Sequence, residues 1–209
     1  DASGTKRPGA ISFSIAKDSR AFETLIDSTT AAISGNVIAF FGASKGSVSF
    51  TKIVEGQSPA AQGIGKPESL GNGVFAAATV STNGLIFAFS PQTSKVYAYD
   101  TATSQWVGDG DDASGAAEGD YQLSAMGGKW VLLDKTAGRV WVQGVGGSKT
   151  FTPSATAKLQ TPSPDSSTAY FSTEEGIYSI SLTAGDVKEV QRAAGTNSAP
   201  TWFEGNVYS

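Results

Sequence analysis

Short alternating strands that follow a glycine or serine recur along this chain at a nearly regular interval. Five such starts are recognisable, at Gly9, Gly46, Ser94, Gly138 and Gly176. Successive starts lie 37, 48, 44 and 38 residues apart. An interval of this size is typical of repeat architectures in which each copy is one supersecondary unit. The sequence therefore predicts a small β-unit that is repeated, with each copy covering the apolar face of its neighbour.

The clearest copy covers residues 95–106, with the sequence KVYAYDTATSQW. Its first half consists of β-forming residues whose side chains alternate in size, as on a pleated strand with two different faces. The polar residues 100–104 follow, and Asp, Thr and Ser favour a tight turn. A second strand then begins near Trp106. We therefore predict a β-hairpin here.

Three further kinds of strand accompany these starts. A nearly continuous apolar strand precedes each start after Gly9, which predicts burial on both faces, at 37–41, 85–89, 130–133 and 169–171. A weaker strand of small residues, suited to a crowded inner position, comes before that one, at 30–33, 74–78, 121–125 and 157–160. A more polar strand is expected on the outside of each unit, at 21–25, 105–107, 149–151 and 187–190. Polar outer strands protect the edge of a sheet from pairing with other chains. Together the four kinds of strand predict that each unit is a four-stranded antiparallel sheet.

The segment 95–106 resembles the unit-closing strand and turn of kelch, YVTN-type and PQQ-type β-propeller repeats, and residues 138–144 and 176–182 are weaker copies. The resemblance implies an all-β fold, a β-propeller of four-stranded antiparallel blades. The chain departs from kelch repeats because Gly127-Gly128 is a single instance of their glycine pair, and it lacks the regular tryptophan spacing of quinone-dependent propellers. It is also similar in texture to propeller domains of large secreted bacterial surface proteins. That likeness implies a bacterial protein located outside the cell or on its surface.

The two ends of the chain carry complementary halves of a unit. Residues near Gly9 correspond to a third and fourth strand, and residues 200–203 and 206–208 correspond to a first and second strand. Pairing of these halves would close a five-bladed ring without open edges. The alternative is that the chain is part of a larger propeller. In either case we expect a single β-propeller domain over residues 1–209, in which 1–9 form a loose lead-in.

The residue types that are missing exclude several kinds of chemistry. Histidine and cysteine are both absent, which removes histidine-based triads, disulfides, thiolate catalysis and ordinary zinc or haem ligation. The net charge of −4 and the scattered arginines argue against nucleic-acid binding. No apolar run reaches the roughly 18–20 residues of a membrane span, so we expect no membrane insertion. The sequence indicates no catalytic or cofactor-binding residue.

One acidic cluster is a candidate metal site within the predicted loop 108–120. Its members are Asp109, Asp111, Asp112 and Asp120. Closely spaced carboxylates suit calcium, which prefers oxygen ligands, and three of these positions match the first, third and twelfth of an EF-hand loop. The pattern is broken because Ala113 and Ser114 stand at the fifth and sixth positions. Calcium binding and a flexible charged loop both remain open as interpretations.

The remaining features favour binding over catalysis. The other acids lie mainly in predicted turns, where solvated side chains are the ordinary case, and the aromatics are expected to pack between units: Tyr97, Tyr99, Trp106, Trp130, Trp141, Tyr178 and Trp202. We therefore expect a non-catalytic extracellular or cell-surface scaffold that presents loops to a protein or glycan partner. Two alternatives are a glycoside hydrolase or lyase with an axial carboxylate site, and a structural spacer within a larger surface protein.

Overall fold

The computed structural model describes residues 30–42, 46–54, 56–57, 60, 62–165, 167–192, 199–203 and 206–208. This part of the chain is almost entirely β-structure, and its one helix is the 3-10 turn η1 (Glu68–Leu70).

Blade 1 contains β1 (Thr30–Ser34), β2 (Val37–Gly42), β3 (Ser47–Lys52) and β4 (Gln62–Gly63). Blade 2 contains β5 (Ala77–Val80), β6 (Leu85–Ser90), β7 (Lys95–Asp100) and β8 (Gln105–Asp112). Blade 3 contains β9 (Tyr121–Met126), β10 (Lys129–Asp134), β11 (Arg139–Val142) and β12 (Lys149–Thr150). Blade 4 contains β13 (Lys158–Leu159), β14 (Thr168–Ser172), β15 (Gly176–Ser181) and β16 (Val187–Arg192).

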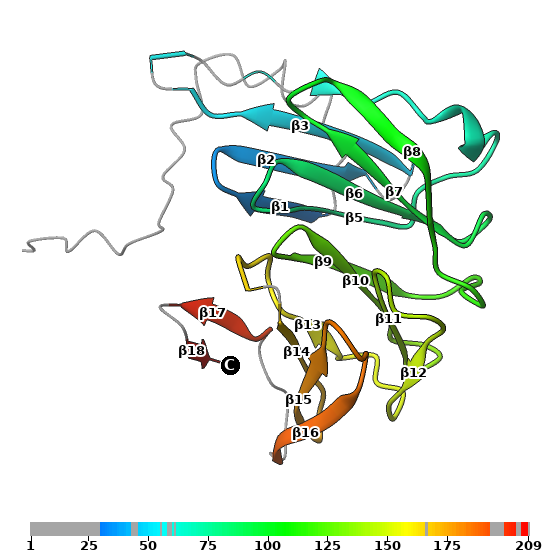
Figure 1. The fold of residues 1–209 in the computed structure, drawn as a ribbon, viewed down its shortest axis with the longest axis vertical. Coiled ribbons are helices and arrows are strands. Elements are labelled where there is room, and N and C mark those ends of the chain that lie inside the picture. The colour runs from blue at the N-terminus through cyan, green and yellow to red at the C-terminus, as the bar shows by residue number, and fades with distance from the viewer. Residues whose placement is uncertain are drawn as a thin grey trace, which may run out of the picture.

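Each blade is a four-stranded antiparallel sheet whose strands lie side by side in chain order. Figure 1 shows blades 1 and 2 overlapping in the upper part of the view, blade 3 (β9–β12) below them and blade 4 (β13–β16) at the bottom. The predicted all-β fold with four-stranded antiparallel blades is confirmed. The unit that recurs at the glycine and serine starts in the sequence is therefore one blade of the structure.

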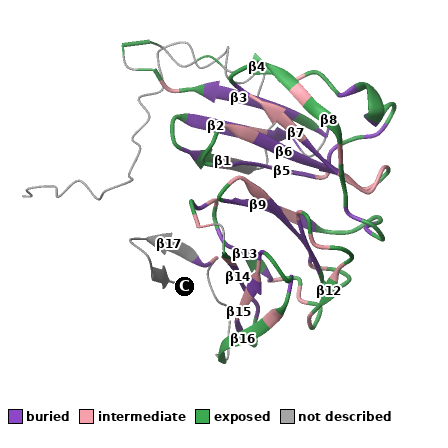
Figure 2. Ribbon diagram, in the orientation of Figure 1, coloured by how far each residue is buried: buried purple, intermediate pink, exposed green. Residues whose placement is uncertain are grey.

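The second strand of each blade is apolar because both of its faces are covered. In β6, Ile86 and Ala88 pack in the cluster shared with blade 1, whereas Phe87 and Phe89 pack in the cluster shared with blade 3. Strand β10 repeats this arrangement between blades 2 and 4. Figure 2 shows the buried residues concentrated along such strands, while the outer strands β8 and β16 are largely exposed. The core therefore consists of layers between neighbouring blades.

Tryptophan side chains connect neighbouring blades by hydrogen bonds as well as by packing. The Trp141 indole N–H donates to the carbonyl oxygen of Ser114, which follows the last strand of blade 2, at 3.0 Å. The Trp106 indole N–H donates to the Gly65 carbonyl oxygen on the blade 1 side at 2.7 Å. The predicted packing of aromatics between units is confirmed for Trp130, Trp141 and Tyr97, which are all buried. The Trp202 side chain lies outside the described residues.

Three strand boundaries differ from the prediction. Strand β4 lies inside the glycine- and proline-rich segment 56–73, where the sequence predicted no strand, and it pairs with β3 through Ser49 and Phe50. Strand β8 continues to Asp112 through the expected acidic loop, with a register shift opposite Val96 and Ala98. Strand β5 begins at Ala77, three residues after the predicted start. These strands extend as far as their backbone pairs with a neighbouring strand. Polar residues and glycines have little preference for strands, so their segments show no strand pattern in the sequence.

The chain ends with a two-stranded antiparallel sheet, β17 (Thr201–Phe203) and β18 (Asn206–Tyr208), as predicted for a first and second strand. The strands expected near Gly9 and at 21–25 lie outside the described residues. Closure by the termini, the number of blades and the extent of the domain therefore stay predictions. Among the described residues no helix is long and apolar enough to span a membrane.

Candidate functional site

The first strands of the four blades line a common axial cavity of about 560 Å³. The small side chains of β1 and β5 leave room for this cavity, as expected for the inner strands predicted from the sequence. The described lining residues come from all four blades and from the segment before β17: Ala32, Ile33, Phe41, Ala76, Ala77, Ala78, Thr79, Asp120, Tyr121, Gln122, Leu123, Ser124, Leu159, Gln160, Thr161, Pro162 and Ala199. A cavity of this size lies within the range of small-molecule sites in proteins.

Most polar groups of the axial cavity are uncharged. Asp120 is the one carboxylate among the described lining residues. Its side chain is 61% exposed and forms an ion pair with Lys135, with 3.4 Å between Nζ and Oδ2. The Asp120 backbone N–H donates to the hydroxyl of Thr136. Asp120 is therefore held at the edge of the site by a cation and by its own backbone.

Two glutamine side chains shape the wall formed by blades 3 and 4. The Gln122 amide oxygen accepts from the Leu159 backbone N–H at 2.7 Å, and its amide nitrogen donates to the Leu159 carbonyl oxygen at 3.4 Å. The Gln122 side chain thus forms, with the backbone of Leu159 in β13, the two hydrogen bonds that a neighbouring strand would form. The Gln160 amide oxygen accepts from the Tyr170 backbone N–H at 3.1 Å within blade 4. Its amide nitrogen is buried without a hydrogen-bond partner.

Tyr121 contributes a buried ring to the cavity but not a reactive phenol. Its ring packs on Phe89 with 4.6 Å between centroids, and its hydroxyl donates to the Ala117 carbonyl oxygen. Burial, followed by the nearby charge of Asp134, raises the pKa of Tyr121 to about 12. The phenol therefore stays protonated at neutral pH and acts as a structural donor.

Three of the four aspartates of the predicted metal site lie on β8, and Asp120 lies directly before β9. The Asp111 carboxylate accepts hydrogen bonds from the Trp130 indole at 3.0 Å and from the Gln143 amide at 2.7 Å. The Asp112 carboxylate accepts from the Ser114 hydroxyl, and that of Asp120 pairs with Lys135. The backbone oxygen of Asp109 accepts from the Lys95 ammonium at 3.1 Å.

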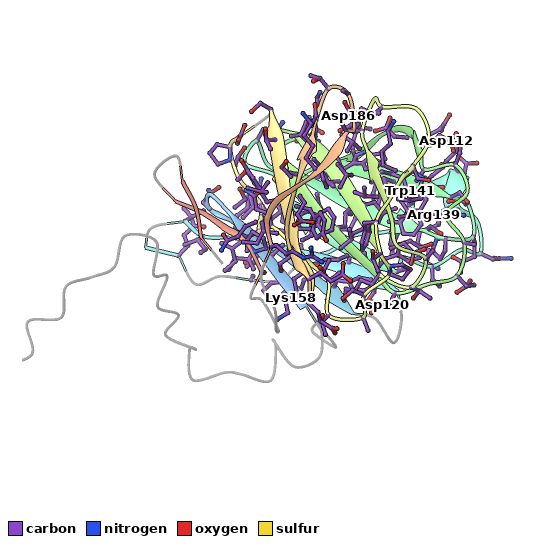
Figure 3. All side chains as sticks on the ribbon, turned by 90° about the horizontal axis from the view of Figure 1, so that it is seen from below. Asp112, Asp120, Arg139, Trp141, Lys158 and Asp186 are labelled. Carbon is purple, nitrogen blue, oxygen red and sulfur yellow. The ribbon has the colours of Figure 1, made fainter. Side chains whose placement is uncertain are left out.

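Figure 3 shows Asp112 and Asp120 at well-separated places on the molecule. Within the described residues no group of three or more acidic side chains converges as metal ligands would. The structure thus gives Asp111, Asp112 and Asp120 other partners, and calcium binding by the four aspartates stays a prediction without support from their placement.

Other acidic residues occupy the turns in which the sequence placed them. The Asp100 carboxylate accepts from the Ala102 backbone N–H at 2.8 Å, and this bond lowers the pKa of Asp100. The Asp134 carboxylate accepts from the backbone N–H groups of Thr136 and Ala137, each at 2.9 Å. Both side chains stabilise turns, as predicted, and neither lines the axial cavity.

The neutral polar residues of the axial cavity were not singled out by sequence reasoning. Thr79, Ser124 and Gln160 are common residue types without a motif. The signal that was available is their position within strands that are otherwise small or apolar. A polar residue in a strand predicted to face the axis is a candidate for lining the cavity.

No family model and no curated protein matches this chain. Solved structures do match, although their sequence identity to this chain is only 10–15%. A streptogramin B lyase structure aligns with a TM-score of 0.54 and 11% identity, covering 81% of this chain and 56% of that one. AztD from Citrobacter koseri gives 0.51 and 10%, covering 79% and 47%. A 6-phosphogluconolactonase-like protein from Bacteroides uniformis gives 0.54 and 15%, covering 86% and 59%.

These neighbours are propeller proteins, and the chain spans less than two thirds of the length of each. They differ in the function that their names give. A likeness at this level of identity shows the fold and leaves the activity open. The four-stranded sheets and the structural neighbours together show that this chain has a β-propeller fold.

Proposed function

We propose that this chain is a non-catalytic binding propeller whose ligand, a glycan or a segment of a protein, enters the axial cavity. The observation that carries the proposal is the lining of that cavity, which combines apolar residues with neutral hydrogen-bonding groups. Binding sites commonly combine these two kinds of group. A structural spacer has no need of hydrogen-bonding groups along this cavity.

The lining does not favour the alternative of a carboxylate-dependent hydrolase or lyase. Glycosidases ordinarily use two carboxyl groups that flank the scissile bond. Asp120 is the one carboxylate among the described residues of the cavity, and it is paired with Lys135. A location outside the cell or on its surface forms part of the proposal. It rests on the likeness of the sequence to secreted propeller domains.

The test is a binding screen with a variant that narrows the cavity. The purified chain is applied to a printed glycan array and to a phage-displayed peptide library, and affinities for the hits are measured by calorimetry. Thr161 is exposed and lines the cavity, so Thr161→Trp should reduce its volume without entering the core. We expect at least about a tenfold loss of affinity, the cost of about 1.4 kcal/mol of lost contact.

The matched control is Thr152→Trp, because Thr152 is equally exposed but does not line the cavity. Unchanged affinity in this control is expected. The proposal fails if neither screen yields a ligand, or if Thr161→Trp binds every ligand as well as the original chain. Mass spectrometry of the incubated ligands should find them intact, and cleaved products would contradict the non-catalytic part.

A further inference from the structure

Four buried polar side-chain atoms in the described part of the chain have no hydrogen-bond partner: Thr51 Oγ1, Thr79 Oγ1, Ser124 Oγ and Gln160 Nε2. Three of these four residues line the axial cavity. Thr79 and Gln160 are 1% exposed, and Ser124 is 2% exposed. Folded proteins rarely leave such atoms unpaired, because each loses its water without gaining a partner. Their concentration at one cavity therefore calls for an explanation.

The three groups come from three successive blades. Thr79 lies on β5 in blade 2, Ser124 on β9 in blade 3, and Gln160 directly after β13 in blade 4. The two hydroxyl groups can donate and accept a hydrogen bond, while the free amide nitrogen of Gln160 can only donate. A partner that satisfies all three must itself offer several groups that accept and donate.

Charge narrows the choice of partner. No lysine or arginine is among the described residues that line the cavity, so an anion would find no counter-charge there. The single carboxylate, Asp120, is already paired with Lys135. A cation would therefore compete with an existing ion pair at the edge of the site. Burying a charged ligand without a partner is unfavourable, so an uncharged ligand fits this lining best.

We infer that the axial cavity binds an uncharged, hydroxyl-rich ligand of the saccharide type, held by Thr79, Ser124 and Gln160. This inference rests on the proposed function and selects the glycan over the protein ligand. Sugar hydroxyl groups both donate and accept, which matches the three unpaired groups. The three atoms are covered in the unliganded protein, so binding includes a rotation of the Thr79 and Ser124 side chains between staggered rotamers and a shift of the residues that cover the Gln160 amide.

The test uses substitutions that remove one polar atom and keep the shape of the side chain. Thr79→Val and Ser124→Ala are made in the full 209-residue chain. Thr51→Val is the matched control, because the Thr51 hydroxyl is also buried and unpaired but does not line the cavity. The probes are glucose, galactose, cellobiose and lactose, with glucuronic acid and glucosamine as charged counterparts. Affinity is measured by calorimetry, and the Tm of the unliganded protein by differential scanning calorimetry.

All three variants should keep or raise the unliganded Tm, by up to about 2–4 °C, because an unpaired buried atom has been removed. Thr79→Val and Ser124→Ala should bind the neutral sugar about tenfold more weakly, while Thr51→Val should bind it as the original chain does. A lower Tm for both cavity variants would show that their hydroxyls have partners in the free protein, and would overturn the inference.

Other outcomes separate this inference from the proposed function. Binding of a neutral sugar with unchanged affinity in both cavity variants overturns the assignment of these residues but leaves a binding propeller. Preference for the charged sugars, or for peptides alone, overturns the ligand class in the same way. Failure of both the sugar probes and the wider screens overturns the proposed function as well.

Discussion

Replacing Trp141 by phenylalanine tests whether the indole hydrogen bonds hold neighbouring blades together. Trp141 is 2% exposed and packs in the cluster shared by blades 2 and 3. Its indole N–H donates to the Ser114 carbonyl oxygen at 3.0 Å, and phenylalanine cannot make this bond. The substitution also leaves part of the indole volume empty.

The expected cost has two parts. Loss of one partly buried hydrogen bond costs about 0.5–1.5 kcal/mol. The smaller ring leaves a cavity that costs about 1–2 kcal/mol, less than the 3–5 kcal/mol of truncation to alanine. Together they predict that Trp141→Phe lowers the free energy of unfolding by about 1.5–3.5 kcal/mol.

Urea unfolding followed by circular dichroism measures this change. The control is Trp106→Phe, which also loses an indole bond across blades, to the Gly65 carbonyl oxygen, but at a half-buried position where that bond is exposed to solvent. Because water replaces the lost partner there, the control should cost about 1 kcal/mol or less. A cost for Trp141→Phe within 0.5 kcal/mol of zero, or equal to that of the control, would refute the reasoning.

Three further predictions concern single positions. Gly138 has φ +62°, and a Cβ atom there would lie 2.4 Å from the Phe151 carbonyl oxygen, so Gly138→Ala should cost about 3 kcal/mol or more in urea unfolding. Gly144 has φ +77° but open space around it, so Gly144→Ala should cost only about 1–2 kcal/mol, and equal costs would contradict the role of the clash. Gln122→Leu removes both side-chain bonds to the backbone of blade 4 and should cost about 2 kcal/mol, whereas an unchanged urea midpoint would show that the bonds add nothing. The pKa of Tyr121 is raised to about 12 in the folded chain, so its contribution to stability is complete below the unfolded value near pH 10 and is lost as the pH rises towards 12. Urea midpoints of the original chain should fall more steeply over this range than those of Tyr121→Phe, and parallel curves would argue against the shift.

The blades could be predicted from the sequence because strong local signals mark their second and third strands. The predicted hairpin at 95–106 is present as β7 and β8, and the apolar partner strands are β2, β6, β10 and β14. Burial on both faces requires continuous apolar residues, and this requirement is visible in the sequence. Outer strands face solvent and make few side-chain contacts, so β4 and the acidic half of β8 left no pattern to detect.

The candidate site was harder to predict than the fold. The acidic cluster was predicted as a metal site because its residues are close in sequence, yet Asp112 and Asp120 lie far apart and have separate partners (Figure 3). The axial cavity instead gathers Thr79, Ser124 and Gln160 from three blades, and no sequence motif connects them. Sites assembled across repeats depend on which strand faces the axis, and that information comes from the whole sheet.

The tryptophan bonds between blades have a consequence for how such a protein can diverge. The Trp141 and Trp106 indoles both end on backbone carbonyl oxygens, which every residue type provides. The donor blade must therefore keep its tryptophan, but the accepting blade is free to change its side chains at the point of contact. Because only the tryptophan side of each contact is constrained, neighbouring blades can diverge in sequence and still stay attached to each other.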